Sequence, residues 1–160
     1  MSHQARKRFG QNFLVDDQII SRIVATISPK KSDNIVEIGP GKGALTFPLL
    51  EHLDHLSVIE IDRDLISLLK LEKQEKLTIY EADALKFDYG LMSNNLRIIG
   101  NLPYNISSPL LFRLLSSKNQ IIDMTFMLQK EVVDRIVASH GSKTYGRLSV
   151  MMQTFFEVES

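Results

Sequence analysis

The stretch Asn34–Gly43, with the sequence NIVEIGPGKG, decides the fold of this chain. Its first five residues have the composition of a short buried strand, and the glycine-rich run GPGKG follows them directly. Apolar residues then return at helical spacing between Leu45 and Leu53. A strand, a glycine-rich turn and a helix in this order predict one unit of a parallel α/β sheet, with the turn at the carboxyl end of the strand.

The same alternation continues on both sides of this stretch. A helix is expected from Asp16 or Asp17 to Ile27, because an aspartate can cap the first turn and the Ser28-Pro29 pair ends it. Strands are further expected over 56–61, 77–80, 96–100 and 121–128, and helices over 63–71, 109–115, 131–138 and 148–155. This order predicts an α/β fold of the Rossmann-like kind, a mostly parallel sheet with helices on both faces.

Composition narrows the possible functions. The chain has 160 residues, 44% of them hydrophobic, which is enough for the core of one domain. Nineteen basic residues balance nineteen acidic ones, so binding to nucleic acid by bulk charge alone is not expected. The absence of cysteine excludes a disulfide scaffold, zinc held by cysteine and thiolate catalysis, and it suits a reducing compartment.

No feature of the sequence predicts a membrane or a metal as a partner. No apolar run reaches the roughly 18 residues of a membrane span, and the basic start of the chain lacks the apolar region of a signal peptide. His52 and His55 form an HxxH pair, but no carboxylate is convincingly placed with them. We therefore expect a cytoplasmic protein without a metal site.

The glycine loop and Glu60 together predict a cofactor that contains a nucleoside. Gly39 and Gly41 let the backbone approach a ligand closely, and Glu60 ends the next strand, 21 residues after Gly39. A carboxylate at this distance typically accepts hydrogen bonds from a ribose diol. The spacing G-x-G-x-G differs from the dinucleotide pattern and favours a cofactor without pyrophosphate, such as S-adenosyl-L-methionine. The alternative is an ordinary turn followed by a surface glutamate.

Asp83 follows the third expected strand in the segment EADAL. A carboxylate there can accept a hydrogen bond from an adenine amino group, while the flanking apolar residues sandwich the ring. The alternative is an aspartate that only caps a helix or a turn.

The turn after the fourth strand, Asn101-Leu102-Pro103-Tyr104, predicts chemistry on an exocyclic amine. Such an amine is a poor nucleophile, because its lone pair is delocalised into the ring. The Asn101 side chain and the Leu102 carbonyl could accept the amine hydrogens and let the nitrogen become tetrahedral. Pro103 fixes the turn, and Tyr104 offers a face on which a flipped-out base can stack. The alternative is a purely structural turn.

Five segments occur in the order of a known family: KRFGQNFL (7–14), EIGPGKGALT (37–46), VIEIDRDL (58–65), EADAL (81–85) and NLPYNISSPLLF (101–112). The chain resembles the ribosomal RNA adenine dimethyltransferases, and most of all those of the small-subunit type. The resemblance implies S-adenosyl-L-methionine as the cofactor. It also implies dimethylation of two adjacent adenosines near the 3′ end of 16S rRNA, during biogenesis of the small ribosomal subunit.

The resemblance also carries site residues by position. It adds two residues of the N-terminal motif that composition and spacing do not point to, Asn12 and Leu14. The implied cofactor contacts are Asn12, Leu14, Gly39, Glu60, Asp83 and Asn101.

The end of the chain resembles a domain that stops early. Residues 155–160 look like the end of a helix and the start of a new strand. We expect residues 1–160 to form a cofactor-binding catalytic domain without its last strands and without the small helical domain of the family. The fifth strand would then be an exposed edge. A chain of this length is expected to keep a cofactor pocket but not to dimethylate rRNA, and its oligomeric state stays open.

Three alternative functions remain. The first is a macrolide-resistance-type dimethyltransferase that modifies a large-subunit adenosine. The second is a nicotinamide-dependent oxidoreductase, which the short glycine spacing and the Asn-Leu-Pro-Tyr turn argue against. The third is a non-catalytic RNA-binding assembly factor on the same fold.

Overall fold

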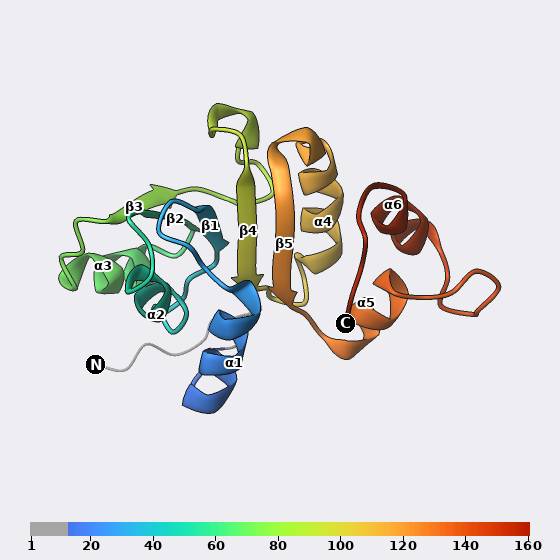
Figure 1. Ribbon diagram of the computed structural model, residues 1–160, viewed down its shortest axis with the longest axis horizontal. Helices are drawn as coiled ribbons and strands as arrows, with labels where there is room; N and C mark the ends of the chain where they lie inside the picture. The colour runs from blue at the N-terminus through green and yellow to red at the C-terminus, as the bar shows by residue number, and fades with distance from the viewer. Residues whose placement is uncertain (1–12) are drawn as a thin grey trace.

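The computed structural model describes residues 13–160, which are built around one five-stranded sheet (Figure 1). The strands are β1 (Asn34–Ile38), β2 (Leu56–Glu60), β3 (Leu77–Glu81), β4 (Leu96–Asn101) and β5 (Ile121–Met127). Their order is β3-β2-β1-β4-β5, and every neighbouring pair is parallel. Each expected strand is present with bounds that agree within one residue, so the predicted α/β fold is confirmed.

Helices connect the strands. They are α1 (Asp17–Ile27), α2 (Thr46–Leu50), α3 (Arg63–Leu71), α4 (Ser107–Leu115), α5 (Lys130–Ile136) and α6 (Arg147–Phe155), with short 3-10 turns η2 (Tyr89–Leu91) and η3 (Lys118–Gln120). Asp16 caps α1 by accepting the backbone N–H groups of Gln18 and Ile19. Ser28 then adopts a left-handed conformation before the proline, which ends the helix as predicted.

Three helix predictions need correction. Helix α4 begins at Ser107 rather than at Pro109, because the backbone turn after β4 runs straight into it. Helix α5 ends at Ile136 rather than at Ala138. The helix expected between Leu45 and Leu53 is shortened to α2 and continues as a turn.

The core lies on both faces of the sheet. On one face, α4 and the segment around η2 cover side chains such as Val36, Ile38 and Ile98. On the other face, α1 and α2 cover Ile35, Val58 and their neighbours. Alternate residues of β1 therefore point into different cores, and the strand is apolar almost throughout for that reason.

Helices α5 and α6 lie beyond α4, at the side of the sheet that carries β5 (Figure 1). They pack on the outer side of α4 through a third apolar cluster that includes Val132, Leu148 and Met152. Among residues 13–160, no further strand pairs with the outer edge of β5. Phe126 and Leu128 are only half-buried and pack against the α4, α5 and α6 cluster.

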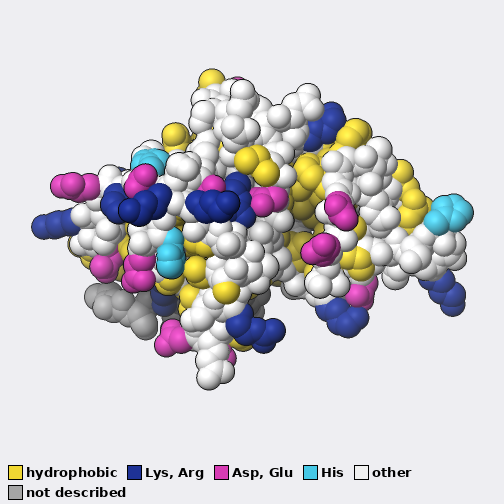
Figure 2. Space-filling view, in the orientation of Figure 1, with side chains coloured by type: hydrophobic (Ala, Val, Ile, Leu, Met, Phe, Trp, Pro, Cys, Tyr) yellow, Lys and Arg dark blue, Asp and Glu magenta, His cyan; other side chains and the backbone are white. Residues whose placement is uncertain are grey.

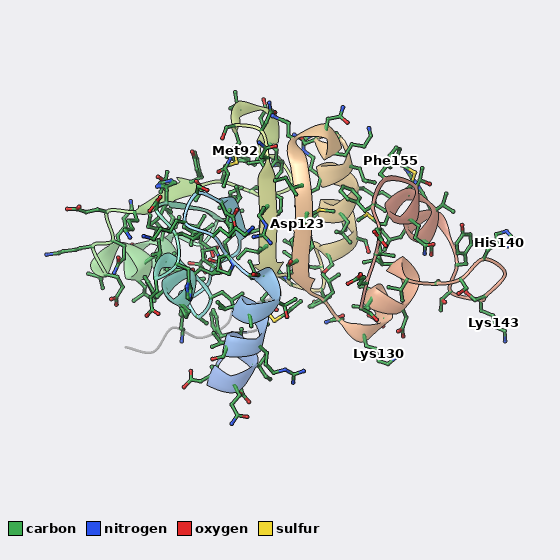
Figure 3. The ribbon with its side chains drawn as sticks, in the orientation of Figure 1. Met92, Asp123, Lys130, His140, Lys143 and Phe155 are labelled. Carbon is green, nitrogen blue, oxygen red and sulfur yellow. The ribbon has the colours of Figure 1, made fainter. Side chains whose placement is uncertain are left out.

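Acidic and basic side chains are interspersed on the face of the molecule in Figure 2, in keeping with the zero net charge. At the amino edge of the sheet, three charged side chains form a partly buried cluster. Arg97 of β4 binds Asp33 through Nη1 at 2.8 Å and Asp123 of β5 through Nε at 3.0 Å, and it donates to the Ile27 carbonyl at 2.6 Å. Figure 3 labels Asp123 on β5. This cluster ties α1, β4 and β5 together.

Candidate functional site

The glycine loop after β1 bends around the carboxyl edge of the sheet. Gly39, Gly41 and Gly43 have φ values of +66°, +58° and +89°, a left-handed region that side chains rarely adopt. The N–H of Gly39 still donates to the Ile59 carbonyl at 2.9 Å, so the start of the loop stays attached to β2. The sequence prediction of a sharp, ligand-approaching turn here agrees with this geometry.

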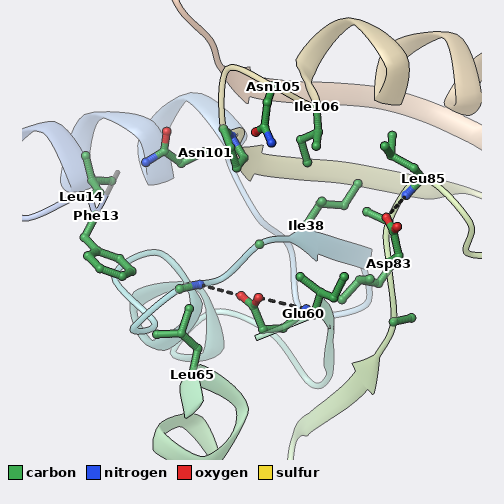
Figure 4. Close-up of a pocket in the computed structure, with 17 residues that line it drawn as sticks. Phe13, Leu14, Ile38, Glu60, Leu65, Asp83, Leu85, Asn101, Asn105 and Ile106 are labelled. Carbon is green, nitrogen blue, oxygen red and sulfur yellow. Dashed lines mark hydrogen bonds between the residues drawn. The ribbon is translucent and has the colours of Figure 1, made fainter. Parts of the chain in front are cut away.

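A cavity of about 300 Å³ lies at the carboxyl ends of β1, β2, β3 and β4 (Figure 4). It is the edge where ligands bind in parallel α/β sheets. Seven residues that the sequence analysis singled out line it together: Leu14, Gly39, Gly41, Glu60, Asp83, Asn101 and Pro103. Asn12 lies outside the described residues.

Glu60 ends β2 with its carboxylate at the cavity wall and only 6% of the residue exposed. Its Oε1 accepts the N–H groups of Ile61 at 2.9 Å and Asp62 at 3.0 Å, and its Oε2 accepts that of Gly41 at 3.4 Å. Burial raises the pKa of this carboxyl, although the three N–H groups oppose the shift. Because the contact to Gly41 is long, Oε2 keeps capacity to accept a hydrogen bond from a ligand.

A second carboxyl, Glu37, lies beneath the glycine loop. It is 2% exposed, and its Oε2 accepts the Thr46 hydroxyl at 2.6 Å. Burial raises its pKa to about 7; the Thr46 hydrogen bond lowers it, and the charge of Glu60 raises it further. Since Thr46 is the first residue of α2, this bond joins the end of β1 to the start of the helix and closes the base of the loop.

Asp83 has a structural role and also lines the cavity. Its Oδ1 accepts the N–H of Leu85 at 2.9 Å, as in the turn-forming alternative considered above. Its Oδ2 has no hydrogen-bond partner within residues 13–160. One oxygen thus holds the turn while the other can accept a donor from a ligand (Figure 4).

The turn after β4 begins at Asn101, which lines the cavity. Leu102 is buried, and its N–H donates to the Met127 carbonyl at 3.1 Å. In the described part of the chain no group donates to the Leu102 carbonyl, so this oxygen keeps its full acceptor capacity. Tyr104 is 57% exposed and does not belong to the cavity wall. The structure thus gathers Asn101 and Pro103 at the cavity and leaves the Tyr104 ring at the surface.

Gly100 explains how β4 reaches the cavity. A Cβ atom at this position would lie 2.6 Å from the backbone carbonyl oxygen of Ile38 on β1. Only glycine allows this close approach of the two strands directly before Asn101.

Several cavity residues were not predicted from the sequence. They are Phe13, Ile38, Ile59, Ile61, Leu65, Asn105 and Ile106. Ala82, Ala84 and Leu85 also line the cavity, and they are the apolar residues around Asp83 that were expected beside an adenine ring. Most of the residues that were missed are apolar and have the same composition as ordinary core. Phe13 lies against the glycine loop, with Lys42 Nζ 4.7 Å from its ring centroid. Asn105 carries the only uncharged polar side chain in this set. It directly follows the Asn101–Tyr104 turn, so the prediction of a site at that turn could have been extended to it.

Among residues 13–160, no three histidine or carboxylate side chains lie close enough together to hold a metal ion, and His55 contacts the Thr78 hydroxyl at 3.1 Å. In the same part of the chain, no helix is both long and apolar enough to cross a bilayer.

The sequence of the chain is also similar to those of known proteins. The family model described as "Ribosomal RNA adenine dimethylase" matches residues 2–160. The chain belongs to this family. Membership agrees with the resemblance seen in the sequence motifs.

Curated relatives within the family are named ribosomal RNA small subunit methyltransferase A. The one from Methylobacillus flagellatus is 58% identical over 99% of this chain and 63% of its own length. The one from Dechloromonas aromatica is 56% identical over 98% of this chain and 62% of its own length. The chain thus spans a little over three fifths of the relatives it matches.

Solved structures in the family have the same architecture. A dimethyladenosine transferase from Plasmodium falciparum superposes with a TM-score of 0.79 and 34% identity, over 89% of this chain and 52% of that one. The 23S rRNA methyltransferase ErmE superposes with a TM-score of 0.75 and 29% identity, over 89% of this chain and 57% of that one.

Proposed function

We propose that this protein is an S-adenosyl-L-methionine-dependent rRNA adenine dimethyltransferase. Its substrate would be two adjacent adenosines near the 3′ end of 16S rRNA in the small ribosomal subunit, and its place the cytoplasm, where ribosomes are assembled. The observation that carries the proposal is the cavity, which combines a glycine loop and Glu60 with Asn101, the residue that directly precedes the buried Leu102. Residues 1–160 would form the cofactor-binding catalytic domain.

The residues present fit this cofactor. Glu60 Oε2 can accept hydrogen bonds from the ribose hydroxyls, and Asp83 Oδ2 can accept one from the adenine amine. Ile61 and Ala82 offer apolar contact to the adenine ring. Gly39 and Gly41 leave room for the methionine portion at the loop. Leu14 and Asn12 are proposed as further contacts from the N-terminal motif.

The chemistry follows from the acceptors. S-Adenosyl-L-methionine supplies an electrophilic methyl group on a positively charged sulfur. The Asn101 side-chain carbonyl and the Leu102 backbone carbonyl would accept the two hydrogens of the adenosine amine and localise its lone pair on nitrogen. With the cofactor bound, that lone pair would form the new C–N bond as the C–S bond breaks, and S-adenosyl-L-homocysteine would leave. The cationic amine would then release a proton to water, so no strong base is needed. A second cofactor molecule would supply the second methyl group to the same nitrogen.

The remaining members of the turn would hold the base in place. Pro103 fixes the turn by its restricted φ, and its own carbonyl is occupied by the N–H of Ile106 and the hydroxyl of Ser107. Tyr104, exposed beside the cavity, offers a stacking surface to a base that has left its helix.

The small-subunit target is supported by the names of the curated relatives at 56–58% identity. The large-subunit alternative is represented by ErmE at 29% identity. A methyl-transfer assay with the full-length protein decides between them: it is incubated with labelled S-adenosyl-L-methionine and undermethylated small or large subunits, and the modified bases are mapped.

We expect label in two adjacent adenosines of 16S rRNA, and none when Asn101 is replaced by alanine. Label only in large-subunit RNA would show that the protein is a dimethyltransferase of the macrolide-resistance type. Cofactor binding without any methyl transfer, together with equal support of subunit assembly by the Asn101→Ala variant, would favour the non-catalytic assembly factor.

A further inference from the structure

We propose that Asn105 is a specificity-determining residue that recognises the ring edge of the target adenine. Its side-chain amide would donate a hydrogen bond to the ring nitrogen next to the reacting amine. This inference rests on the proposed function, because it requires an adenosine whose amine is held by Asn101 and the Leu102 carbonyl.

The position of Asn105 is the first observation. The residue lines the cavity together with Asn101 and Pro103, and it is also exposed to solvent, so it stands at the mouth where a base would enter. Figure 4 shows its amide directed into the cavity, near Asn101 and Ile106. Within residues 13–160 this amide has no hydrogen-bond partner. Its donors and its acceptor are therefore available to a ligand.

The backbone that carries Asn105 is held firmly. The Pro103 carbonyl accepts the N–H of Ile106 at 3.2 Å and the hydroxyl of Ser107 at 2.9 Å, which closes the turn on both sides of Asn105. Ser107 is 1% exposed, and the Leu110 N–H donates to the Ile106 carbonyl at 2.8 Å. A side chain on such a turn is positioned before the base arrives, which suits recognition better than a mobile loop does.

The chemistry of the amide matches adenine. The amine of adenine is flanked by two ring nitrogens, N1 and N7, that accept hydrogen bonds, and asparagine pairs with this edge in nucleic-acid recognition. Guanine carries a carbonyl in place of the amine and a proton on N1. With the amine hydrogens engaged elsewhere, an N–H donor beside them favours adenine and disfavours a base whose neighbouring ring nitrogen is protonated.

The test uses substrates that lack one ring nitrogen. Small subunits are rebuilt with adenosine, 1-deazaadenosine or 7-deazaadenosine at the target positions, and single-turnover methyl transfer is measured for the full-length wild type and for the full-length Asn105→Ala variant. We expect Asn105→Ala to slow transfer to adenosine by about tenfold. The wild type should methylate one of the two analogues about tenfold more slowly than adenosine. On that analogue, Asn105→Ala should be no slower than the wild type.

A second variant and two controls keep the outcome readable. Asn105→Asp keeps the size but loses the N–H donors, so it should be slowed like Asn105→Ala. Asn119→Ala changes an exposed asparagine near the start of β5, away from the cavity, and should behave as wild type. Calorimetric titration with S-adenosyl-L-methionine should give the same affinity for all variants, which shows that the cofactor pocket is intact.

Two results overturn the inference while leaving the proposed function in place. The first is that Asn105→Ala methylates adenosine at the wild-type rate. The second is that, on both analogues, Asn105→Ala slows transfer by the same factor as it does on adenosine. A wild type that binds cofactor but methylates no adenosine overturns the proposed function, and the inference about Asn105 with it.

Discussion

The pKa of Asp33 at the amino edge of the sheet is shifted in the opposite direction to those of Glu37 and Glu60 at the carboxyl edge. At the amino edge, Asp33 and Asp123 are paired with Arg97 at 2.8–3.0 Å. Burial raises the pKa of Asp33, but the Lys30 N–H and the Arg97 guanidinium outweigh it and lower the pKa overall. At the carboxyl edge, Glu37 and Glu60 have raised pKa values, with burial as the largest cause.

The partners explain the difference. Among residues 13–160, the amino-edge acids bind a cation, whereas Glu37 binds a hydroxyl and Glu60 binds backbone N–H groups. A neutral partner satisfies hydrogen bonding without cancelling the charge, so burial dominates. One edge is therefore arranged to hold the elements together, and the other keeps two carboxyls with raised pKa values at the cavity wall and beneath the glycine loop.

The largest effect is expected from Arg97→Met, which removes the cation of the amino-edge cluster. It removes the cation from two partly exposed carboxylates and a donor from the Ile27 carbonyl, and it should lower the free energy of unfolding by about 2–4 kcal/mol. Urea denaturation measures this. Arg63→Met is the matched control, because its ion pair with Glu81 is exposed and should contribute less than about 1 kcal/mol. Equal effects of both variants would show that the amino-edge cluster is not structural.

The carboxyl edge is tested by Glu60→Ala. Loss of a buried hydrogen-bonding carboxylate should weaken S-adenosyl-L-methionine binding by about 1.5–3 kcal/mol, or roughly tenfold to a hundredfold. Calorimetric titration measures the dissociation constant. Glu81→Ala, at the exposed end of the neighbouring strand, is the control and should bind normally. An unchanged constant for Glu60→Ala would refute its role in binding.

Tyr104→Ala separates binding of the cofactor from binding of the target base at the carboxyl edge. The ring is exposed and outside the cavity, so cofactor affinity should not change. Engagement of the target base should weaken by about 1–3 kcal/mol, the contribution of one stacked aromatic ring. Single-turnover methylation against substrate concentration measures it, with Tyr104→Phe expected to restore the wild-type behaviour. Failure of the phenylalanine variant would indicate a role for the hydroxyl rather than for stacking.

The smallest effect is a pH dependence with opposite signs at the two edges. Folded Glu37 holds its proton up to about pH 7, while the unfolded chain releases it near its ordinary value of 4.5. Stability should therefore fall as the pH rises through this window, by on the order of 1–2 kcal/mol. Asp33, with its lowered pKa, should lose its contribution only in acid.

Urea denaturation at several pH values checks this sign. Glu37→Gln should flatten the fall between pH 5 and about pH 7, leaving the smaller part due to Glu60, and Asp33→Asn should leave that fall intact. A steeper fall in the Glu37→Gln variant would contradict the assignment.

The sequence was sufficient to predict the strands, because each is a short apolar run between breaks in helical spacing. It was also sufficient for the cavity residues Gly39, Glu60, Asp83 and Asn101, since the carboxyl ends of parallel strands meet at one edge. The roles of these residues stay predictions.

What the sequence could not provide depends on contacts between distant segments. Arg97 looks like an interruption in an apolar strand until Asp33 and Asp123 are brought beside it. Glu37 looks like a strand residue until Thr46 closes over it. The start of α4 at Ser107 was missed because the hydroxyl bond to Pro103 that supports it is not a periodic signal.

The pairing of the strands also has a consequence for how the protein folds. Every strand pair is parallel, so each joins segments far apart in the chain, such as Ile35 with Leu56 and Asn34 with Leu96. No local hairpin can form early, and loop closure must precede most of the stabilising contacts. Because the cavity draws its walls from four of these strands, it exists only once the sheet is assembled. The rate at which a refolding chain regains cofactor binding will therefore report the completion of folding, not an early collapsed state.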